Sequence, residues 1–213
     1  MTRIKICGIT NLQDALAATD AGAHALGFVF APSSPRCISP ENAAEIIRQL
    51  PPFVQTVGVF VDAERSVVND VIRECGIDTL QLHGQETPSE TTGYPVRVVK
   101  GFRISGAADL ESLSRYRVSA YLLDTYVPGL EGGTGKTFDW TLAREARHFG
   151  RIILSGGLRD ENVGEAIRTA RPYAVDVSSG LENSPGKKSV EKMIRFVEAV
   201  RSADLEIQNK RGD

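Results

Sequence analysis

The feature that most constrains the fold of this chain is a repeated alternation between two kinds of segment. Short runs of β-branched or apolar residues are each followed by a stretch with helical periodicity, and the cycle occurs eight times in 213 residues. Such alternation predicts parallel strands joined by helical crossovers. Eight units predict an α/β fold of the TIM-barrel class, a single closed (β/α)8 barrel with outer helices, although the chain is short for that fold. An open doubly wound sheet is the alternative.

The expected elements follow from periodicity and from the residues that end helices. We expect strands over 3–7, 25–30, 56–61, 79–83, 96–101, 120–124, 152–155 and 173–178. We expect helices over 12–21, 40–50, 64–75, 86–93, 107–116, 140–147, 162–170 and 189–202. Asn11 and Ser39, the latter before Pro40, are expected N-terminal caps. Glycines stand where three helices should end: Gly22, Gly76 and Gly93.

The composition excludes several classes of protein. A net charge of −2 and a pI near 6.0 give no basic surface for nucleic acid or an anionic membrane. The three cysteines form no CxxC pair, which favours a reducing compartment. The N-terminus lacks the apolar run of a signal peptide, and no segment has the ~20 apolar residues of a membrane helix. We therefore expect a cytoplasmic protein with neither a nucleic-acid nor a membrane partner. The sequence leaves open whether it is a monomer or a homodimer.

The same chain shows one domain and no sign of a bound cofactor. Residues 1–203 are expected to form the barrel, and residues 204–213 read as a polar, frayed C-terminal tail. The histidines at 24, 83 and 148 lack the spacing of metal ligands, and no cofactor fingerprint is present. We expect neither a metal nor a cofactor.

Polar residues interrupt strands that should be apolar, mostly near the carboxyl ends, where barrel enzymes build their active sites. Because side chains alternate along a strand, three strands each place a pair on one face, expected to be the barrel interior: Lys5 with Cys7, Gln81 with His83, and Asp176 with Ser178. The first and eighth strands are neighbours in a closed barrel. We therefore predict a Lys5–Asp176 ion pair beneath the site.

Two interpretations are possible for each of four residues: Cys7, Asp124, His83 and Arg36. Cys7 is either a small buried hydrophobe or a nucleophile or base at a strand end. Asp124 either caps the following loop or is a partly desolvated carboxyl group that acts as a general acid. His83 fits a packed, satisfied histidine better than a base. Arg36, in the loop over 31–39, is either a solvated charge or a two-point ligand for a substrate carboxylate.

Glycine-rich segments follow the last three strands. LEGGTGK at 130–136 resembles half of a P-loop, but its spacing does not fit, so we reject a nucleoside triphosphate site. Ser155-Gly156-Gly157 follows the seventh strand, and Ser178-Ser179-Gly180 follows the eighth. Barrels often bind phosphate with these two loops, and glycine lets the backbone approach an anion closely. The sequence therefore predicts a phosphate site there.

Seven motifs together resemble the phosphoribosylanthranilate isomerase family. They occur in the family's order and span nearly the whole chain: IKICGIT at 4–10, GFVFAPSSPR at 27–36, QLHG at 81–84, LLDT at 122–125, GGTGKTFDW at 132–140, LSGGL at 154–158 and DVSSGLE at 176–182. Several are modest alone, but jointly they are very specific.

The resemblance implies a role for each matching residue. Cys7 would be the general base, Asp124 the general acid, and Arg36 the ligand of the anthranilate carboxylate. The phosphate would be surrounded by Gly156, Gly157, Ser178, Ser179 and Gly180. His83 of QLHG and Gly133 of GGTGK are included with the substrate-binding residues. The implied reaction is an Amadori rearrangement of N-(5′-phosphoribosyl)anthranilate in tryptophan biosynthesis, without a cofactor.

Three other interpretations are compared with this one. A histidine-pathway aldose–ketose isomerase catalyses the same chemistry. Such enzymes generally carry an aspartate at the position of Cys7. Indole-glycerol-phosphate synthase usually presents lysines at its chemical centre and is longer. A catalytically silent phosphosugar-binding barrel is the rival outside enzymes. Stabilisation by a substrate-like phosphate without turnover would favour it.

Overall fold

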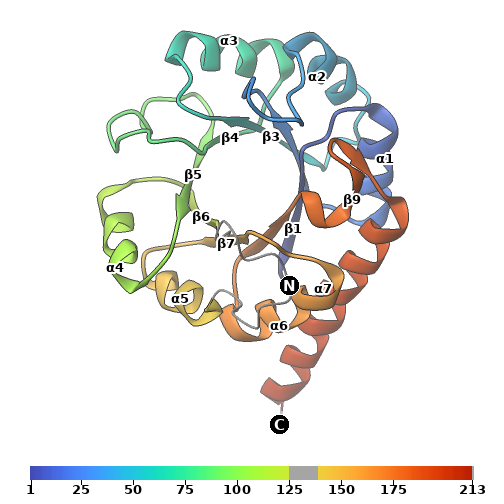
Figure 1. Cartoon of the computed structure of the whole chain (residues 1–213), viewed down its shortest axis with the longest axis vertical. Helices are drawn as coiled ribbons and strands as arrows, with labels where there is room; N and C mark the ends of the chain where they lie inside the picture. Colours follow the sequence, from blue (N-terminus) through green and yellow to red (C-terminus); the bar gives the residue numbers. More distant parts are fainter. Residues whose placement is uncertain (125–138, 213) are drawn as a thin grey trace.

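The structure, a computed structural model, describes residues 1–124 and 139–212. Eight parallel strands pair in chain order and close into a barrel, because β1 hydrogen-bonds both β2 and β8. Figure 1 looks along this barrel, with the helices outside the ring of strands. The strands are β1 (Arg3–Cys7), β2 (Ala25–Val29), β3 (Gln55–Phe60), β4 (Thr79–Leu82), β5 (Arg97–Arg103), β6 (Ala120–Asp124), β7 (Ile152–Ser155) and β8 (Ala174–Val177). The predicted fold class is confirmed.

The outer layer consists of helices that pack their apolar side chains on the strands. They are α1 (Leu12–Ala21), α2 (Pro40–Ile47), α3 (Arg65–Cys75), α4 (Ala107–Leu110), α5 (Trp140–Glu145), α6 (Asp160–Ala170) and α7 (Val190–Gly212). Short 3-10 helices continue α4 (η1, Glu111–Arg115) and α5 (η2, Ala146–His148). The expected caps are present, since Asn11 accepts a hydrogen bond from the Asp14 N–H at 2.8 Å and Ser39 accepts one from Asn42. No helix in the described part of the chain is long and apolar enough to cross a membrane.

The segment 86–93, predicted to be a helix, consists of turns, so the prediction was wrong there. Its polar side chains form hydrogen bonds with backbone groups that lie close in space, and these bonds compete with helix formation. The Glu86 carboxylate accepts hydrogen bonds from the N–H groups of Gly84 (2.9 Å) and Asp62 (3.0 Å) and pairs with Lys100 at 3.2 Å. The Thr87 N–H and hydroxyl both donate to Glu90. A turn-rich connection therefore joins β4 to β5.

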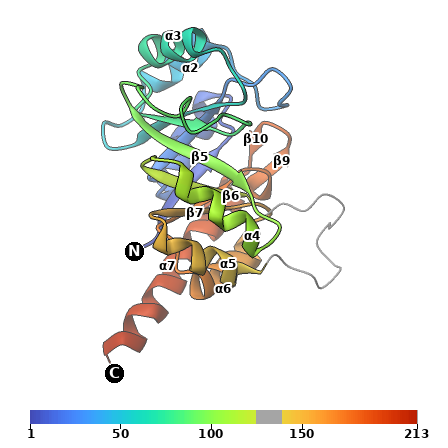
Figure 2. The same cartoon turned by 90° about the vertical axis from the view of Figure 1, so that its left-hand side faces the viewer.

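The C-terminal residues differ from the expected frayed tail. Helix α7 continues through residue 212, and Figure 2 shows it projecting beyond the barrel. Asp204 is buried and accepts hydrogen bonds from the N–H (2.5 Å) and the hydroxyl (2.8 Å) of Thr2. Good helix formers follow it, so nothing in the sequence ends the helix at residue 203.

A two-stranded hairpin after β8 was not anticipated. Strands β9 (Glu182–Ser184) and β10 (Lys187–Lys188) pair antiparallel, after a 3-10 turn η3 (Ser179–Leu181). Figure 1 shows the hairpin beside α1. It is held there because the Lys188 N–H donates to Asp14 at 2.8 Å and the Thr10 hydroxyl donates to the Gly186 carbonyl at 2.5 Å. The hairpin thus covers part of the carboxyl-terminal mouth.

Within the described residues the core has three parts, of which the two largest lie on opposite faces of the strands. The larger lies between the strands and the helices and includes Ile6, Phe28, Phe60 and Phe196, all fully buried. The smaller follows the other side of the strands, inside the barrel, and consists of Val99, Ala120, Leu122, Ile153 and Ala174. Polar residues continue this inner face towards the carboxyl ends and form the candidate site.

Candidate active site

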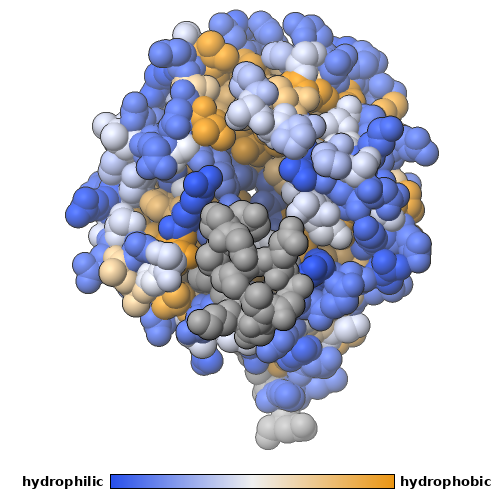
Figure 3. Space-filling model, viewed as in Figure 1, coloured by the Kyte–Doolittle hydropathy of each residue, from blue (hydrophilic) through white to orange (hydrophobic). Residues whose placement is uncertain are grey.

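The predicted catalytic residues lie at the carboxyl-terminal mouth of the barrel. Cys7 is the last residue of β1, Asp124 is the last of β6, and Ser178 directly follows β8. Parallel strands bring these ends to one edge, as the sequence predicted. Figure 3 views this mouth, which is hollowed at its centre, with hydrophilic residues to the left and right of the hollow. Gly133 lies outside the described residues.

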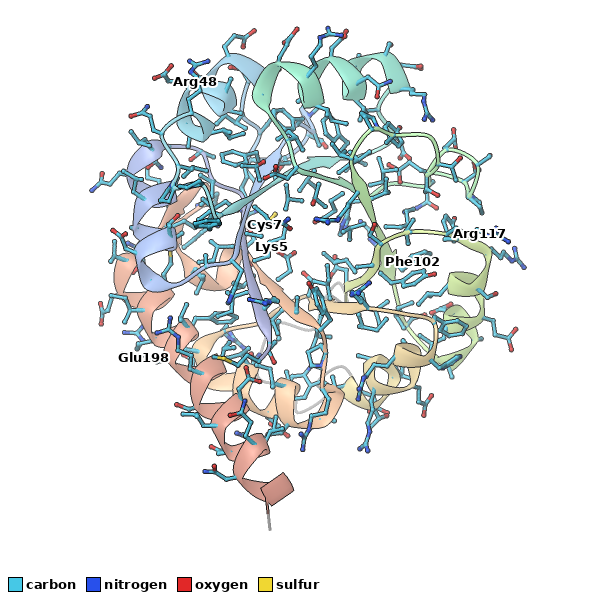
Figure 4. The ribbon with its side chains drawn as sticks, turned by 180° about the vertical axis from the view of Figure 1, so that it is seen from behind. Lys5, Cys7, Arg48, Phe102, Arg117 and Glu198 are labelled. Atoms are coloured by element: carbon cyan, nitrogen blue, oxygen red, sulfur yellow. The ribbon has the colours of Figure 1, made fainter. Side chains whose placement is uncertain are left out.

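Cys7 is buried at the wall of the site. Its side chain is 8% exposed and packs with Val29, Ala31 and Val59. Gly27 on β2 gives it room, because a Cβ there would lie 2.7 Å from the Cys7 Sγ and 3.1 Å from the Lys5 Cε. Figure 4 shows Lys5 and Cys7 close together on β1, pointing into the barrel.

Lys5 forms the predicted ion pair. Its Nζ lies 2.8 Å from the Asp176 Oδ1, and the two residues face each other in the β1–β8 register. Ser155 donates to the other oxygen of Asp176 at 3.2 Å. Burial alone would lower the pKa of Lys5, but Asp176 and Cys7 outweigh it and raise that pKa. Lys5 is therefore a permanent positive charge beneath the thiol.

Asp124 lies beside a histidine that a buried amide orients. The His83 Nε2 is 3.5 Å from the Asp124 Oδ2, and both side chains are about one-fifth exposed. The Gln81 Nε2 is 3.1 Å from the His83 Nδ1. With that amide nitrogen as donor, Nδ1 is the acceptor, so the ring proton sits on Nε2 and faces Asp124. Gly101 makes room for the ring, since a Cβ there would lie 2.6 Å from Nδ1.

Arg36 is held by an acid that the sequence analysis missed. Its Nε and Nη2 donate to the two carboxylate oxygens of Glu182 at 2.7 and 2.6 Å. Lys188 contributes a second cation, with its Nζ 2.8 Å from Glu182 and 3.2 Å from the Ser178 carbonyl. The ENSPGKK sequence that carries both residues contains a turn signal, and its charged flanks were the available clue.

The charges in this cluster are mutually stabilised. Burial alone would raise the pKa of Glu182, but hydrogen bonds from Arg36 and Lys188 outweigh burial and lower that pKa. The hydrogen bond to Glu182 raises the pKa of Arg36. Burial lowers the pKa of Lys188, although its bond to Glu182 opposes that shift. One carboxylate thus lies between two cations.

The two loops predicted to bind phosphate are packed against each other. Gly156 and Gly157, after β7, have φ angles of 89° and 61°, which favour glycine. A Cβ on Gly180 would collide with the Leu158 carbonyl, so this close approach of the loops after β7 and β8 requires glycine. Ser178 and Ser179 lie beside Gly180 in the second loop. The arrangement brings the predicted phosphate residues together.

A cavity of about 550 Å³ opens at the opposite, amino-terminal end of the barrel. It is lined partly by cationic side chains and by Phe53, which is 96% exposed. Within the described residues its lining includes neither Cys7 nor Asp124. The placement of the candidate active site therefore rests on the chemistry of the strand ends and not on the size of a cavity.

Comparison with known proteins decides the family. A family model described as N-(5′-phosphoribosyl)anthranilate isomerase matches residues 4–199. The chain belongs to the phosphoribosylanthranilate isomerase family. A family member from Geobacter sp. (strain M21) is 57% identical over 197 residues, covering 92% of this chain and 97% of that protein. One from Pelobacter propionicus is 51% identical over 206 residues, covering 97% and 99%.

Solved structures of the family agree with the fold. A phosphoribosylanthranilate isomerase from Thermotoga maritima superposes with a TM-score of 0.89 at 46% identity, covering 95% of this chain and 100% of that one. A second family structure, in complex with reduced 1-(o-carboxyphenylamino)-1-deoxyribulose 5-phosphate, has a TM-score of 0.87 at 43% identity, with the same coverage. The family resemblance inferred from the seven motifs is confirmed.

Proposed function

We propose that this chain isomerises N-(5′-phosphoribosyl)anthranilate in tryptophan biosynthesis, with Cys7 as the general base and Asp124 as the general acid. The observation that carries the assignment is the position of these two groups. They end β1 and β6, which are not neighbours in the barrel, so they can reach different sides of a sugar held in the mouth. Membership of this family also favours this substrate over that of the histidine-pathway isomerase.

The reaction assigns one proton transfer to each group. Asp124 protonates the ring oxygen of the furanose, and the C1′–O bond breaks to give an open-chain iminium ion. The thiolate of Cys7 then removes the proton from C2′, which produces an enolamine. Tautomerisation of the enolamine gives the aminoketose product. Each such transfer contributes roughly 10²–10⁴-fold to the rate.

The remaining residues would bind the two anionic ends of the substrate. Arg36 binds the anthranilate carboxylate. The phosphate lies against the loops after β7 and β8, formed by Gly156, Gly157, Ser178, Ser179 and Gly180. His83 lies against Asp124, and Gly133 belongs to the same proposed set. The family structure with bound product analogue holds a ligand with both a carboxylate and a phosphate, which supports this arrangement.

The test follows the decay of anthranilate-adduct fluorescence, with the substrate made in situ. Wild-type protein should convert it rapidly, and Cys7→Ala and Asp124→Ala should each be slower by at least ~10²-fold. Glu191→Gln, at an exposed ion pair on α7, is the control and should match wild type. Near-normal turnover of Asp124→Ala would contradict the acid assignment. Binding of the product analogue without turnover by wild-type protein would indicate a silent phosphosugar-binding barrel.

The assembly and the location of the protein stay predictions. One Thermotoga maritima relative is described as a monomer generated from a dimeric isomerase. We infer that this chain is a monomer or a homodimer, and light scattering coupled to size-exclusion chromatography distinguishes the two. The cytoplasmic location predicted from the sequence is tested by fractionating cells that express the protein.

A further inference from the structure

We propose that Glu182 is a positioning residue that aims Arg36 at the substrate carboxylate and thereby determines selectivity for a carboxylated aromatic amine. The proposal rests on the proposed function, since it concerns the same site. It starts from the two hydrogen bonds that join the Arg36 guanidinium to Glu182, at 2.7 and 2.6 Å.

This contact fixes which edge of the guanidinium faces the substrate. A guanidinium has five N–H donors in a rigid planar fork. Glu182 takes the edge formed by Nε and Nη2, which leaves the edge formed by Nη1 and Nη2 to receive a second carboxylate. Glu182 is itself buried, at 5% side-chain exposure, whereas Arg36 is 21% exposed. The edge held by Glu182 therefore lies against a buried acid, and the partly exposed Arg36 has its other edge left for a ligand.

The backbone of β1 places this arginine next to the proposed base. Gly8, the residue after Cys7, has a φ of 76°, and a Cβ there would collide with the Arg36 Cδ. The arginine stem thus lies across Gly8, directly beside Cys7 in the chain. A carboxylate bound to Arg36 would lie close to the sulfur that removes the C2′ proton.

Lys188 keeps the cluster positive and links it to the phosphate loop. The charges of Arg36 and Glu182 alone would cancel. With Lys188 included, the ionised cluster carries one net positive charge. The Lys188 side chain is fully buried, and its Nζ also donates to the Ser178 carbonyl at 3.2 Å. The β9–β10 hairpin therefore ties the arginine for the carboxylate to the loop for the phosphate, which fixes the spacing between the two anions.

The test compares two ligands that differ only in the carboxylate. They are the reduced product analogue, 1-(o-carboxyphenylamino)-1-deoxyribitol 5-phosphate, and its phenylamino counterpart, with dissociation constants measured by calorimetry. For Glu182→Gln we expect the carboxylated ligand to weaken by ~10-fold or more, because a neutral amide cannot accept both guanidinium bonds. The phenylamino ligand should keep its wild-type affinity. Glu191→Gln, which removes a carboxylate far from the site, should leave both affinities unchanged.

The two ligands distinguish the positioning of Arg36 from simple support of the phosphate loop. Equal weakening of both ligands by Glu182→Gln would mean that Glu182 only supports that loop, and it would overturn the proposal. An unchanged ratio of affinities with normal binding would overturn it as well. Glu182→Asp should show the same selective loss of affinity for the carboxylated ligand as Glu182→Gln, because the shorter side chain retracts from Arg36. Failure of wild-type protein to bind either ligand would instead contradict the proposed function.

Discussion

Lys5 and Asp176 face each other across the β1–β8 seam, with the Nζ 2.8 Å from the Oδ1 and both side chains at most 7% exposed. This contact joins the first strand to the last, at the place where the barrel closes. It also holds the ammonium group beneath Cys7. One ion pair therefore contributes both to the closure of the fold and to the charge at the proposed base.

Asp176→Asn should be strongly destabilising. It leaves the Lys5 charge buried without its carboxylate, and breaking a buried pair on one side costs about 3–5 kcal/mol. Urea unfolding measures the change. Lys5→Met with Asp176→Leu, which removes both charges, should recover much of the loss, whereas an equally unstable double variant would show that the unpaired charge is not the cause.

The contribution of Lys5 to stability should not change with pH near neutrality. Its pKa is raised in the folded protein, so the stabilisation is complete below the unfolded pKa of about 10.4. It is lost only as the pH rises from there through the folded pKa. The difference in unfolding free energy between wild type and Lys5→Met should therefore be constant from pH 7 to pH 9. A decline within that interval would show that Lys5 loses its proton much earlier.

Gly27→Ala should reduce activity by disturbing Cys7 and Lys5 together. The added Cβ would lie 2.7 Å from the sulfur, and overpacking of this kind costs about 1–3 kcal/mol. Gly76→Ala is the matched control, because its site has open space but a φ of 70°. We expect it to lose about 1 kcal/mol of stability and no activity. Steady-state kinetics and thermal unfolding of both variants make the comparison.

The barrel could be predicted from the sequence because its signals are local. Alternating apolar and helical segments, the cap at Asn11 and the glycine at 76 each act within a few residues. The Lys5–Asp176 pair followed from a single further rule, that the first and last strands of a closed barrel are neighbours. The helix predicted over 86–93 does not form. The Glu86 side chain binds Asp62 and Lys100 instead, and these residues are distant in the sequence, so a local pattern does not reveal the contacts.

The site was predicted less completely for the same reason. Cys7 and Asp124 stand at strand ends, where their positions follow from the strand pattern. Glu182 is separated from Arg36 by 146 positions, so only the folded chain shows that it binds the guanidinium. The orientation of His83 likewise depends on Gln81, whose amide looks like any other polar residue in a strand.

The three cysteines should react with alkylating reagents at very different rates. Burial, followed by the charges of Glu74 and Glu41, raises the pKa of Cys75 to about 11, and its thiol also donates to the Pro40 carbonyl. Two pKa units reduce the thiolate fraction by about 100-fold. At pH 8, iodoacetamide should label the exposed Cys37 and leave Cys75 unmodified, as mass spectrometry of peptides would show. Rapid labelling of Cys75 in folded protein would contradict its burial.

Labelling of Cys37 should not affect turnover. In a Cys37→Ser variant, any inactivation by iodoacetamide should follow modification of Cys7, and the product analogue should protect against it. Loss of activity that tracks Cys37 alone in wild-type protein would place that residue closer to the substrate than its exposed position implies.

Gln81→Met should slow catalysis by releasing the orientation of His83. The amide of Gln81 donates to the His83 Nδ1 at 3.1 Å, and this keeps the ring proton on Nε2, which is 3.5 Å from Asp124. Methionine has a similar volume but no donor, so both ring tautomers become available, and the other one turns a lone pair towards the carboxyl group. We expect kcat to fall roughly 10-fold, within the range for a partly displaced catalytic group, while KM changes little. Gln81→Glu gives the opposite bias, because a carboxylate accepts a hydrogen bond from Nδ1–H and so favours the doubly protonated ring. The pH profile of kcat should therefore change shape in Gln81→Glu but only in height in Gln81→Met. Identical profiles in the two variants would mean that Gln81 fills space and does not orient His83.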